Sequence, residues 1–236
     1  MTDGPRFAVF DLDLTITRYP TWRNYIRYAN RGRPLTVAHA VAATGVAALR
    51  FKAGRQERTE VKQAALQAGL TGRSRAELEP LAEGFADHVM ANGLRQRALS
   101  VIEGHRARGD EIVLASAAVD LVAEPLCERL GIETCIATPM AWEQGPDGEV
   151  LADHFGGPNC YDEEKARRVR AFIAERGGVM VAMYSDHVTD LALLREAERG
   201  VAVNPSPRLR VAAAEHGLEV QDWDASSSEE GAGGTA

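Results

Sequence analysis

The stretch FDLDLTIT, residues 10–17, places two aspartates directly after a short apolar run. Residues Phe7 to Phe10 have the composition of a short buried strand, so Asp11 and Asp13 arrive where that strand ends. The carboxyl ends of strands are where open α/β sheets bind ligands. Two carboxylates held close together repel each other, and a hard cation such as Mg²⁺ relieves that repulsion. The stretch therefore fits a cation site at a strand end and, about equally well, solvated acids in an ordinary turn.

The overall composition is that of a globular protein large enough to bury a core. The chain has 236 residues, of which 45% are hydrophobic and 26% charged, so it can form one large domain or a domain with an insertion. Its net charge of −7 argues against nucleic acid as the main partner. The charge is uneven, however, because residues 18–94 carry 12 Lys and Arg against 6 Asp and Glu.

The cysteines and the apolar stretches indicate the compartment. Cys127, Cys135 and Cys160 form no C-x-x-C pair, which points away from a disulfide scaffold or a zinc site and towards a reducing compartment. The N-terminus shows no basic segment followed by an apolar run, so we expect no signal peptide. The longest apolar stretch, TVAHAVAATGVAAL at residues 36–49, is too short to span a bilayer. We therefore expect a cytoplasmic protein without a transmembrane segment.

Strand and helix patterns alternate after residue 100. Helical patterns at 119–131 and 162–177 separate the apolar runs, and this alternation predicts a doubly wound parallel sheet in an α/β fold. Turn signals at both ends of residues 145–159 predict a β-hairpin-like excursion. The expected strands are residues 7–10, 111–117, 134–142, 178–186 and 200–205, with a possible edge strand at 218–224.

Residues 18–95 break this alternation with four successive helical patterns. Three of them end at a glycine, and Ser74 with Glu77 has the spacing of a helix-capping box. We expect a helical insertion at 18–95 between two parts of an α/β core, residues 1–17 and 96–224. The polar, low-complexity segment 225–236 predicts a disordered tail.

Polar side chains also follow the later strands. Ser116 lies at the end of one apolar run, Asp186 ends another, and Asp190 comes four residues further on. Lys165 lies near the start of a helical pattern. Taken singly, the serine is an ordinary cap, the lysine a solvated side chain and each aspartate a turn former. All of these ordinary explanations must hold at once if the residues do not form a site.

The order of these residues resembles the haloacid dehalogenase-like hydrolases. The family signature is DxDxT, here beginning at Asp11, followed by a serine, a lysine and a DxxxD, here Ser116, Lys165 and the pair Asp186 and Asp190. The finer pattern is similar to subfamily IB, the phosphoserine-phosphatase-like branch. The resemblance implies a Rossmann-like α/β core with a helical cap inserted after the first strand. It also implies a phosphatase that requires Mg²⁺.

The resemblance further implies a role for each residue. Asp11 would be the nucleophile that forms an aspartyl-phosphate, and Asp13 the general acid and then the general base. Ser116 would bind phosphoryl oxygens, and Lys165 would neutralise charge on the nucleophile and the transferring group. The implied metal ligands are Asp11, the backbone carbonyl of Asp13, and Asp186. Asp190 would orient these ligands without binding the metal itself. The chain departs from the family at Leu14 and Ser185, where glycine is usual, and at His187, where a small residue is common.

The inserted segment bears on the substrate. No acid lies between Arg18 and Lys52, so nothing there would balance the ammonium group of phosphoserine. Arg23 and Arg27 share a helix face with aromatic residues beside them, which suits a second anionic group or an anionic membrane surface. The alternative is that these arginines only form the solvated side of a cap helix.

Three functions therefore remain open. The first is an Mg²⁺-dependent hydrolase of small anionic phosphomonoesters other than phosphoserine. The second is a phosphatase of a lipid or protein phosphate at a membrane surface, with a regulatory role such as in the cell cycle. The third is a regulator that binds phosphate without turnover. The intact set of chemical residues speaks against the third, because binding alone does not need Asp13.

Overall fold

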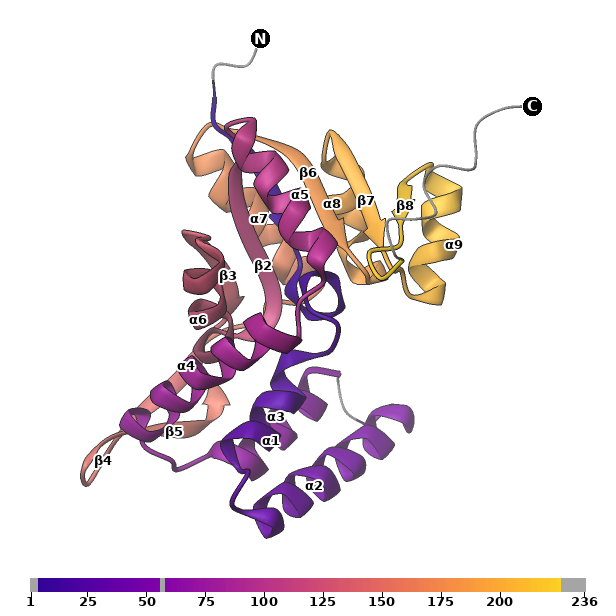
Figure 1. Ribbon diagram of the computed structural model, residues 1–236. Helices are drawn as coiled ribbons and strands as arrows, with labels where there is room; N and C mark the ends of the chain where they lie inside the picture. Colours follow the sequence, from indigo (N-terminus) through magenta and orange to yellow (C-terminus); the bar gives the residue numbers. More distant parts are fainter. Residues whose placement is uncertain (1–3, 56–57, 226–236) are drawn as a thin grey trace.

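The core is a parallel β-sheet (Figure 1), and its first strand lies near the middle of the strand order. The computed structural model describes residues 4–55 and 58–225, so nearly all of the predicted tail lies outside the described residues. The strand order is β3-β2-β1-β6-β7-β8, and each neighbouring pair is parallel. The strands are β1 (Arg6–Phe10), β2 (Glu111–Val119), β3 (Thr134–Thr138), β6 (Val179–Ser185), β7 (Arg199–Val203) and β8 (Glu219–Gln221).

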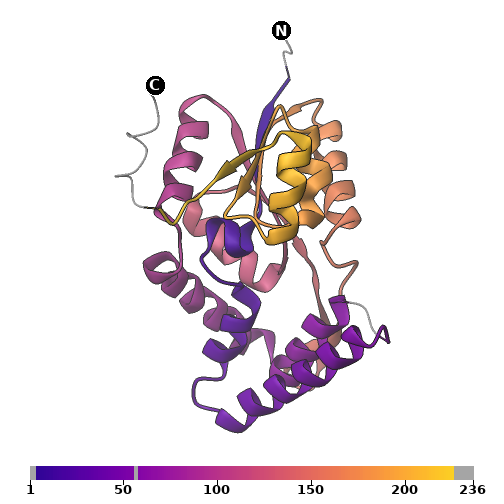
Figure 2. The same cartoon turned by 90° about the vertical axis from the view of Figure 1, so that its right-hand side faces the viewer.

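Helices cover both faces of this sheet, because side chains alternate along each strand. In β1, Ala8 and Phe10 pack into the cluster that includes α5 and α6, whereas Phe7 and Val9 pack into the cluster that includes α7, α8 and α9. Figure 2 shows α5 and the orange and yellow helices on opposite sides of the sheet. The predicted doubly wound α/β fold is confirmed. The helices are α5 (Gln96–Ala107), α6 (Asp120–Leu130), α7 (Glu163–Glu175), α8 (Leu191–Glu196) and α9 (Pro207–His216).

Four helices form the insertion between β1 and β2, which we call the cap. They are α1 (Thr21–Ala29), α2 (Pro34–Lys52), α3 (Arg58–Leu70) and α4 (Arg75–Asn92). Half of the expected capping box is present at α4, where Ser74 Oγ accepts the backbone N–H of Glu77 at 3.2 Å. The Glu77 carboxylate instead pairs with Arg33 and Arg73. The predicted domain boundaries themselves stay a prediction.

The expected strand at residues 134–142 is wrong as a single element. Pro139 has no N–H to donate, and the run divides there into β3 and β4 (Met140–Gly145). β4 pairs with β5 (Gly148–Phe155) as an antiparallel hairpin, which overlaps the excursion expected at 145–159 but begins earlier and ends at Phe155. Leu151 of the hairpin exchanges two backbone hydrogen bonds, each 2.9 Å, with Gly72 and Arg73 of the cap. The hairpin therefore extends the cap over one side of the core.

A buried arginine ties the two cap connections to the core. Arg95 lies where the chain returns from the cap, and its Nη1 donates to the carbonyls of Leu14, Thr15 and Thr17, the last at 2.7 Å. Its Nε and Nη2 hold the Asp224 carboxylate at 3.0 and 2.9 Å. One side chain thus fixes the turn after β1 and the end of the described chain together.

A buried polar network supports the sheet beneath the site. His105 Nδ1 lies 2.7 Å from Asp110 Oδ2, and His105 Nε2 lies 2.8 Å from the hydroxyl of Tyr184. The backbone carbonyl of Tyr184 accepts the N–H of Asp11 at 2.9 Å. A neutral ring that donates from Nδ1 and accepts at Nε2 satisfies both partners. Burial lowers the pKa of His105, against the opposing effect of Asp110.

This network predicts a loss of stability in mild acid. The unfolded state gains a proton on His105 near pH 6.5, whereas the folded state gains it only at lower pH, so stability falls as the pH drops below that value. The loss is at most about 1.4 kcal/mol per pH unit. Melting temperatures from about pH 7 to about pH 5 should fall more steeply for the wild type than for His105→Gln, which cannot titrate. Equal slopes would contradict the prediction.

Candidate active site

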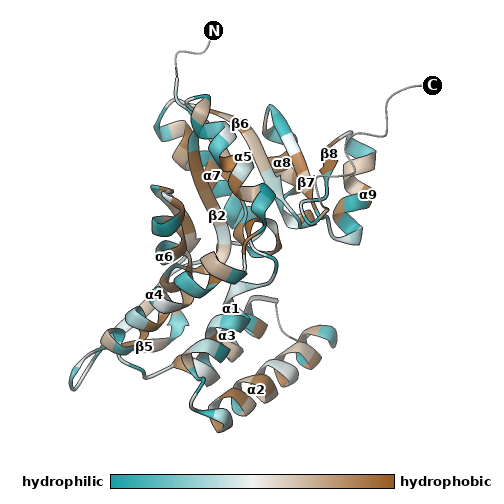
Figure 3. Ribbon diagram, viewed as in Figure 1, coloured by the Kyte–Doolittle hydropathy of each residue, from teal (hydrophilic) through white to brown (hydrophobic). Residues whose placement is uncertain are grey.

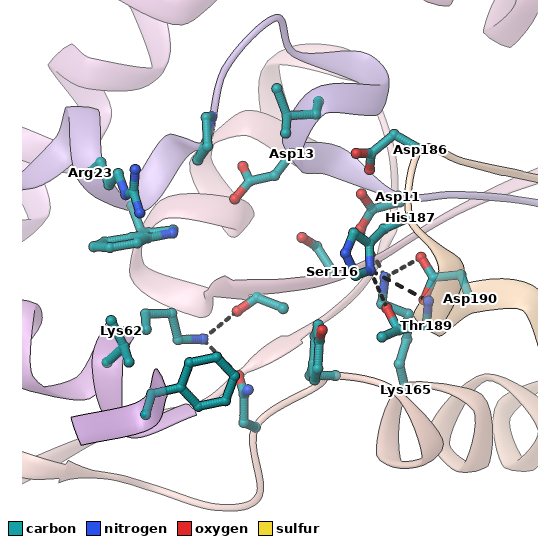
Figure 4. A pocket seen from close by; sticks show the side chains of 18 of the residues that line it. Asp11, Asp13, Arg23, Lys62, Ser116, Lys165, Asp186, His187, Thr189 and Asp190 are labelled. Atoms are coloured by element: carbon teal, nitrogen blue, oxygen red, sulfur yellow. Dashed lines mark hydrogen bonds and ion pairs between the residues drawn. The ribbon is translucent and has the colours of Figure 1, made fainter. Parts of the chain in front are cut away.

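The predicted site residues, apart from Arg27, line a cavity of about 370 Å³ between the core and the cap. Asp11 follows β1 and Asp186 follows β6, both at carboxyl ends of parallel strands. Ser116 lies within β2, which runs on to Val119, but it comes after the last residue of β2 that pairs with β1. Figure 4 shows these core residues on one side of the cavity, with Arg23 and Lys62 of the cap across from them. The predicted core side chains that line it are Asp11, Asp13, Ser116, Lys165, Asp186 and Asp190.

A buried ion cluster forms one wall of this cavity. Lys165 Nζ lies 2.9 Å from Asp11 Oδ1 and 2.8 Å from Asp190 Oδ2, and all three side chains are buried. Ser185 Oγ donates to the same Asp190 oxygen at 2.6 Å. A buried lysine that touches two carboxylates fixes both in place. Asp190 therefore holds Lys165 against Asp11, and Ser185 holds Asp190.

The charges in this cluster do not balance. Burial raises the pKa of Asp11 to about 8, although Lys165 opposes this, and the carboxylates of Asp190 and Asp186 add to it. Burial, and then Asp190, raise the pKa of Asp186 to about 7. Burial acts to lower the pKa of Lys165, but the two carboxylates raise it above its usual value, so the ammonium stays charged. Three carboxylates around one lysine favour a second cation beside Asp11 and Asp186.

The donors present fit a hard divalent cation. In the described part of the chain, no three His, Cys, Asp or Glu side chains converge as a metal site on their own. A cation here would be held by two carboxylates, Asp11 and Asp186, together with a backbone carbonyl and water, which is the ligand set that Mg²⁺ accepts. Asp190 Oδ1 is buried and has no hydrogen-bond partner within the described residues. That oxygen can accept from a water bound in the site.

Asp13 is oriented by the start of the cap. The backbone N–H of Thr21, the first residue of α1, donates to Asp13 Oδ1 at 2.8 Å. Burial raises the pKa of Asp13, against the opposing effect of that hydrogen bond. The next residue, Leu14, has φ of +64°, a left-handed conformation that costs an L-residue about 1–2 kcal/mol. Leucine thus keeps the conformation that glycine, the usual family residue there, adopts freely.

Lys62 of α3 is a cap residue that the motif pattern did not single out. Its Nζ donates to the carbonyl of Ala117 and to Asn159 Oδ1, each at 2.6 Å, and lies 4.9 Å from the ring centroid of Phe155. Burial lowers the pKa of Lys62 to about 8, against the attraction of Asp13. In sequence Lys62 looks like any lysine on an amphipathic helix, so only the tertiary fold reveals it. It joins the cap to the strand segment that carries Ser116.

The two predicted substrate-binding arginines separate. Arg23 lines the cavity beside Trp22, with its guanidinium 4.9 Å from the Trp22 ring centroid. Arg27 is exposed and is not among the described residues that line the cavity. His187 and Leu14, where the chain departs from the family pattern, both line the cavity. His187 Nδ1 lies 3.0 Å from Thr189 Oγ1, which fixes its ring at the end of β6.

The fold is α/β, and the site brings several carboxylates and a buried lysine together in one cavity. The haloacid dehalogenase-like hydrolase family matches residues 8–195 of the chain. Histidinol-phosphatase of Neisseria meningitidis serogroup C is 33% identical over 150 residues, which cover 61% of this chain and 64% of that protein. A protein of unknown function from Bordetella pertussis Tohama I has a TM-score of 0.80 and 29% identity, covering 93% of this chain and 99% of that one.

A phosphoserine phosphatase, solved as a phospho-aspartyl intermediate analogue, shares the fold with a TM-score of 0.64 at 15% identity, covering 92% of this chain and 93% of that one. The chain belongs to the haloacid dehalogenase-like hydrolase family. The resemblance read from the four motifs is thereby confirmed, as is the prediction of an enzyme of this class.

Proposed function

We propose that the protein is an Mg²⁺-dependent phosphatase that hydrolyses a small anionic phosphomonoester other than phosphoserine through an aspartyl-phosphate on Asp11. The observation that carries the proposal is the buried contact of 2.9 Å between Lys165 and Asp11 in a cavity that Asp13 and Asp186 also line. Binding alone would not require a second carboxylate beside the first. The similar proteins named histidinol-phosphatase and phosphoserine phosphatase support the same reaction class.

In the first step the Asp11 carboxylate attacks phosphorus while the bond from phosphorus to the leaving oxygen breaks. The phosphoryl group then resides on Asp11. Lys165 lies against Asp11 and reduces its repulsion from the anionic phosphoryl group. Ser116 lines the cavity just beyond the β2 residues that pair with β1, and it would bind a phosphoryl oxygen. Mg²⁺, held by Asp11, Asp186 and the Asp13 carbonyl, would supply further neutralisation of phosphoryl charge.

Asp13 moves the protons of both steps. Its burial raises its pKa, so the carboxyl group holds a proton more readily than an exposed aspartate and can give it to the leaving alkoxide. The resulting carboxylate takes a proton from a water molecule that attacks the phosphoryl group on Asp11. That attack releases inorganic phosphate and restores both carboxyl groups. The Thr21 amide keeps Asp13 aimed during this exchange.

The cap side of the cavity supports an anionic substrate. Arg23, Lys52 and Lys62 line it, and no acid of the described cap residues does. An ammonium group on that side would face cations without a carboxylate to balance it, which costs binding energy. A second carboxylate or phosphate would find partners there. Trp22 and Phe51 line the same side, and an imidazole could stack on them, so histidinol phosphate is the competing substrate to be tested.

A substrate panel tests this proposal. With Mg²⁺, phosphoglycolate and 3-phosphoglycerate should be hydrolysed at least about tenfold faster in kcat/KM than phosphoserine and histidinol phosphate, because the latter two add an ammonium group that would face the cap cations without a carboxylate. EDTA should abolish all turnover. A preference for histidinol phosphate would contradict the anionic assignment while keeping the reaction class, and no phosphatase activity at all would contradict both.

Arg23→Gln sharpens the same test. It should raise KM for the preferred substrate, which carries a second anionic group, by about tenfold and leave p-nitrophenyl phosphate, which has none beyond its phosphate, almost unchanged. Arg27→Gln is the matched control, because Arg27 lies one helical turn away but outside the cavity lining. Equal effects of the two variants on both substrates would show that Arg23 is only a solvated cation.

A further inference from the structure

The outer side of α2 is an exposed apolar surface. The helix has no charged residue from Pro34 to Leu49, and of its 19 residues only Ala40 and Ala47 are buried. By length and composition α2 is apolar enough to cross a membrane, and only 11% of its apolar window is buried inside the protein. We expected no such segment, because the apolar stretch at residues 36–49 is shorter than the helix, which further residues extend at both ends. The outer face of α2 consists of Leu35, Val41, Val46 and Leu49, which are 49–85% exposed.

This surface differs from that of an ordinary cap helix. A helix on the surface of a globular protein is apolar on the side that packs and polar on the other. The inner side of α2 packs along α3, and Ala40 belongs to the main hydrophobic core. The apolar outer face therefore has no role in packing within the described residues. Figure 3 shows α2 at the edge of the cap farthest from the sheet, with apolar residues along its length.

The charges around α2 select the kind of partner. Basic residues bracket the outer face, with Arg31 and Arg33 before the helix, the second of them paired with Glu77, and Arg50, Lys52 and Arg55 at and beyond its end. No Asp or Glu occurs between Arg18 and Arg55. If a second copy of the chain packed on this face, either helix orientation would bring basic ends against basic ends without acids from this segment to balance them. An anionic partner satisfies both the apolar strip and its basic ends.

We propose that the outer face of α2 docks the protein on a lipid bilayer with anionic headgroups. α2 would lie in the plane of the interface, because its inner side remains packed on α3. The apolar side chains enter the boundary between headgroups and acyl chains. The basic residues at the two ends contact the headgroups, and each such residue increases partitioning onto the membrane by about fivefold. Ala48, Phe51 and Lys52 also line the cavity, so the cavity adjoins the docked face. This docking does not depend on the proposed phosphatase reaction.

Sedimentation of the full chain with vesicles tests the proposal without any assay of turnover. We expect binding to vesicles of phosphatidylcholine mixed with phosphatidylglycerol, much weaker binding to phosphatidylcholine alone, and weakening by salt. Arg31→Gln with Arg50→Gln should weaken binding to the mixed vesicles by about thirtyfold. Neither arginine lines the cavity, so activity on p-nitrophenyl phosphate should be unchanged.

Apolar variants provide a second arm with a matched control. Val41→Asp with Leu49→Asp should reduce binding to the mixed vesicles by at least about tenfold, since buried charge opposes insertion. Val211→Asp on α9 should not, although Val211 is 61% exposed, close to the 65% of Val41. Absence of vesicle binding, or equal loss in all variants, would overturn the proposal. A dimer in sedimentation velocity that only the α2 variants dissociate, without vesicle binding, would instead identify a second copy as the partner.

Discussion

Asp11→Asn should reduce kcat/KM for p-nitrophenyl phosphate by about 10⁴-fold or more, because an amide is neither a nucleophile nor an anionic metal ligand. The variant should still fold. The side-chain oxygen of the asparagine can accept a hydrogen bond from Lys165, whose Nζ lies 2.9 Å from Asp11 Oδ1. The substitution also removes a buried carboxyl group whose ionisation is made unfavourable by burial. Initial rates with Mg²⁺ and a melting curve measure the two effects.

Asp147→Asn is the matched control for that variant. Asp147 lies exposed in the turn between β4 and β5. Its substitution makes the same change of charge as Asp11→Asn, but away from the cavity. It should leave activity within about twofold of wild type. If Asp11→Asn kept activity within about tenfold of this control, Asp11 would not be the nucleophile, since loss of a nucleophile costs far more.

Asp13→Asn should slow steady-state turnover by about 10²–10⁴-fold, because the variant can neither protonate the leaving group nor activate water. The two steps should separate by leaving group. Nitrophenolate leaves without a proton, so its release in a first turnover should stay fast, whereas an alkyl phosphate should already be slow in that step. The Thr21 amide can still hold the side-chain oxygen of asparagine, which limits the change in geometry.

Rapid-quench kinetics with both substrates check the Asp13 prediction. We expect a burst of about one nitrophenolate per enzyme, followed by slow turnover, and no burst with an alkyl phosphate. Equal slowing of the first turnover for both substrates would contradict the general-acid role. An unchanged steady state would remove Asp13 from the reaction altogether.

The core of the fold could be predicted because its signals are local and repeated. Alternating apolar runs and helical patterns fix a parallel sheet, and the glycine after α6, Gly131, takes the left-handed conformation that ends a helix. The run at 134–142 failed, because periodicity cannot show that a strand leaves the sheet at Pro139 and continues in a hairpin. That depends on the cap backbone at Gly72 and Arg73, to which the hairpin is bonded.

The core half of the candidate site could also be read from the sequence. Asp11, Ser116 and Asp186 come from neighbouring strands, so topology alone brings them to one edge of the sheet. The cap half could not, because the orientation of a helix decides which of its side chains reach the cavity. Arg23 lines it and Arg27 does not, although they share a face of α1.

Lys62 and Arg95 escaped prediction for the same physical reason. Each makes its contacts with backbone carbonyls that lie far away in sequence, as Lys62 does with Ala117 and Arg95 with Thr17. Neither kind of contact leaves a motif, because any residue can supply a carbonyl. Buried cations that bind carbonyl oxygens across a domain junction become visible only in the three-dimensional structure.

Mass spectrometry of the phosphorylated enzyme tests the central claim most directly. Asp13→Asn, mixed with p-nitrophenyl phosphate and Mg²⁺ and quenched in acid within the burst, should carry one phosphoryl group on the peptide that contains Asp11. The double variant with Asp11→Asn should carry none. A burst of nitrophenolate without a phosphoryl group on that peptide, or with the group on another residue, would contradict nucleophilic catalysis by Asp11.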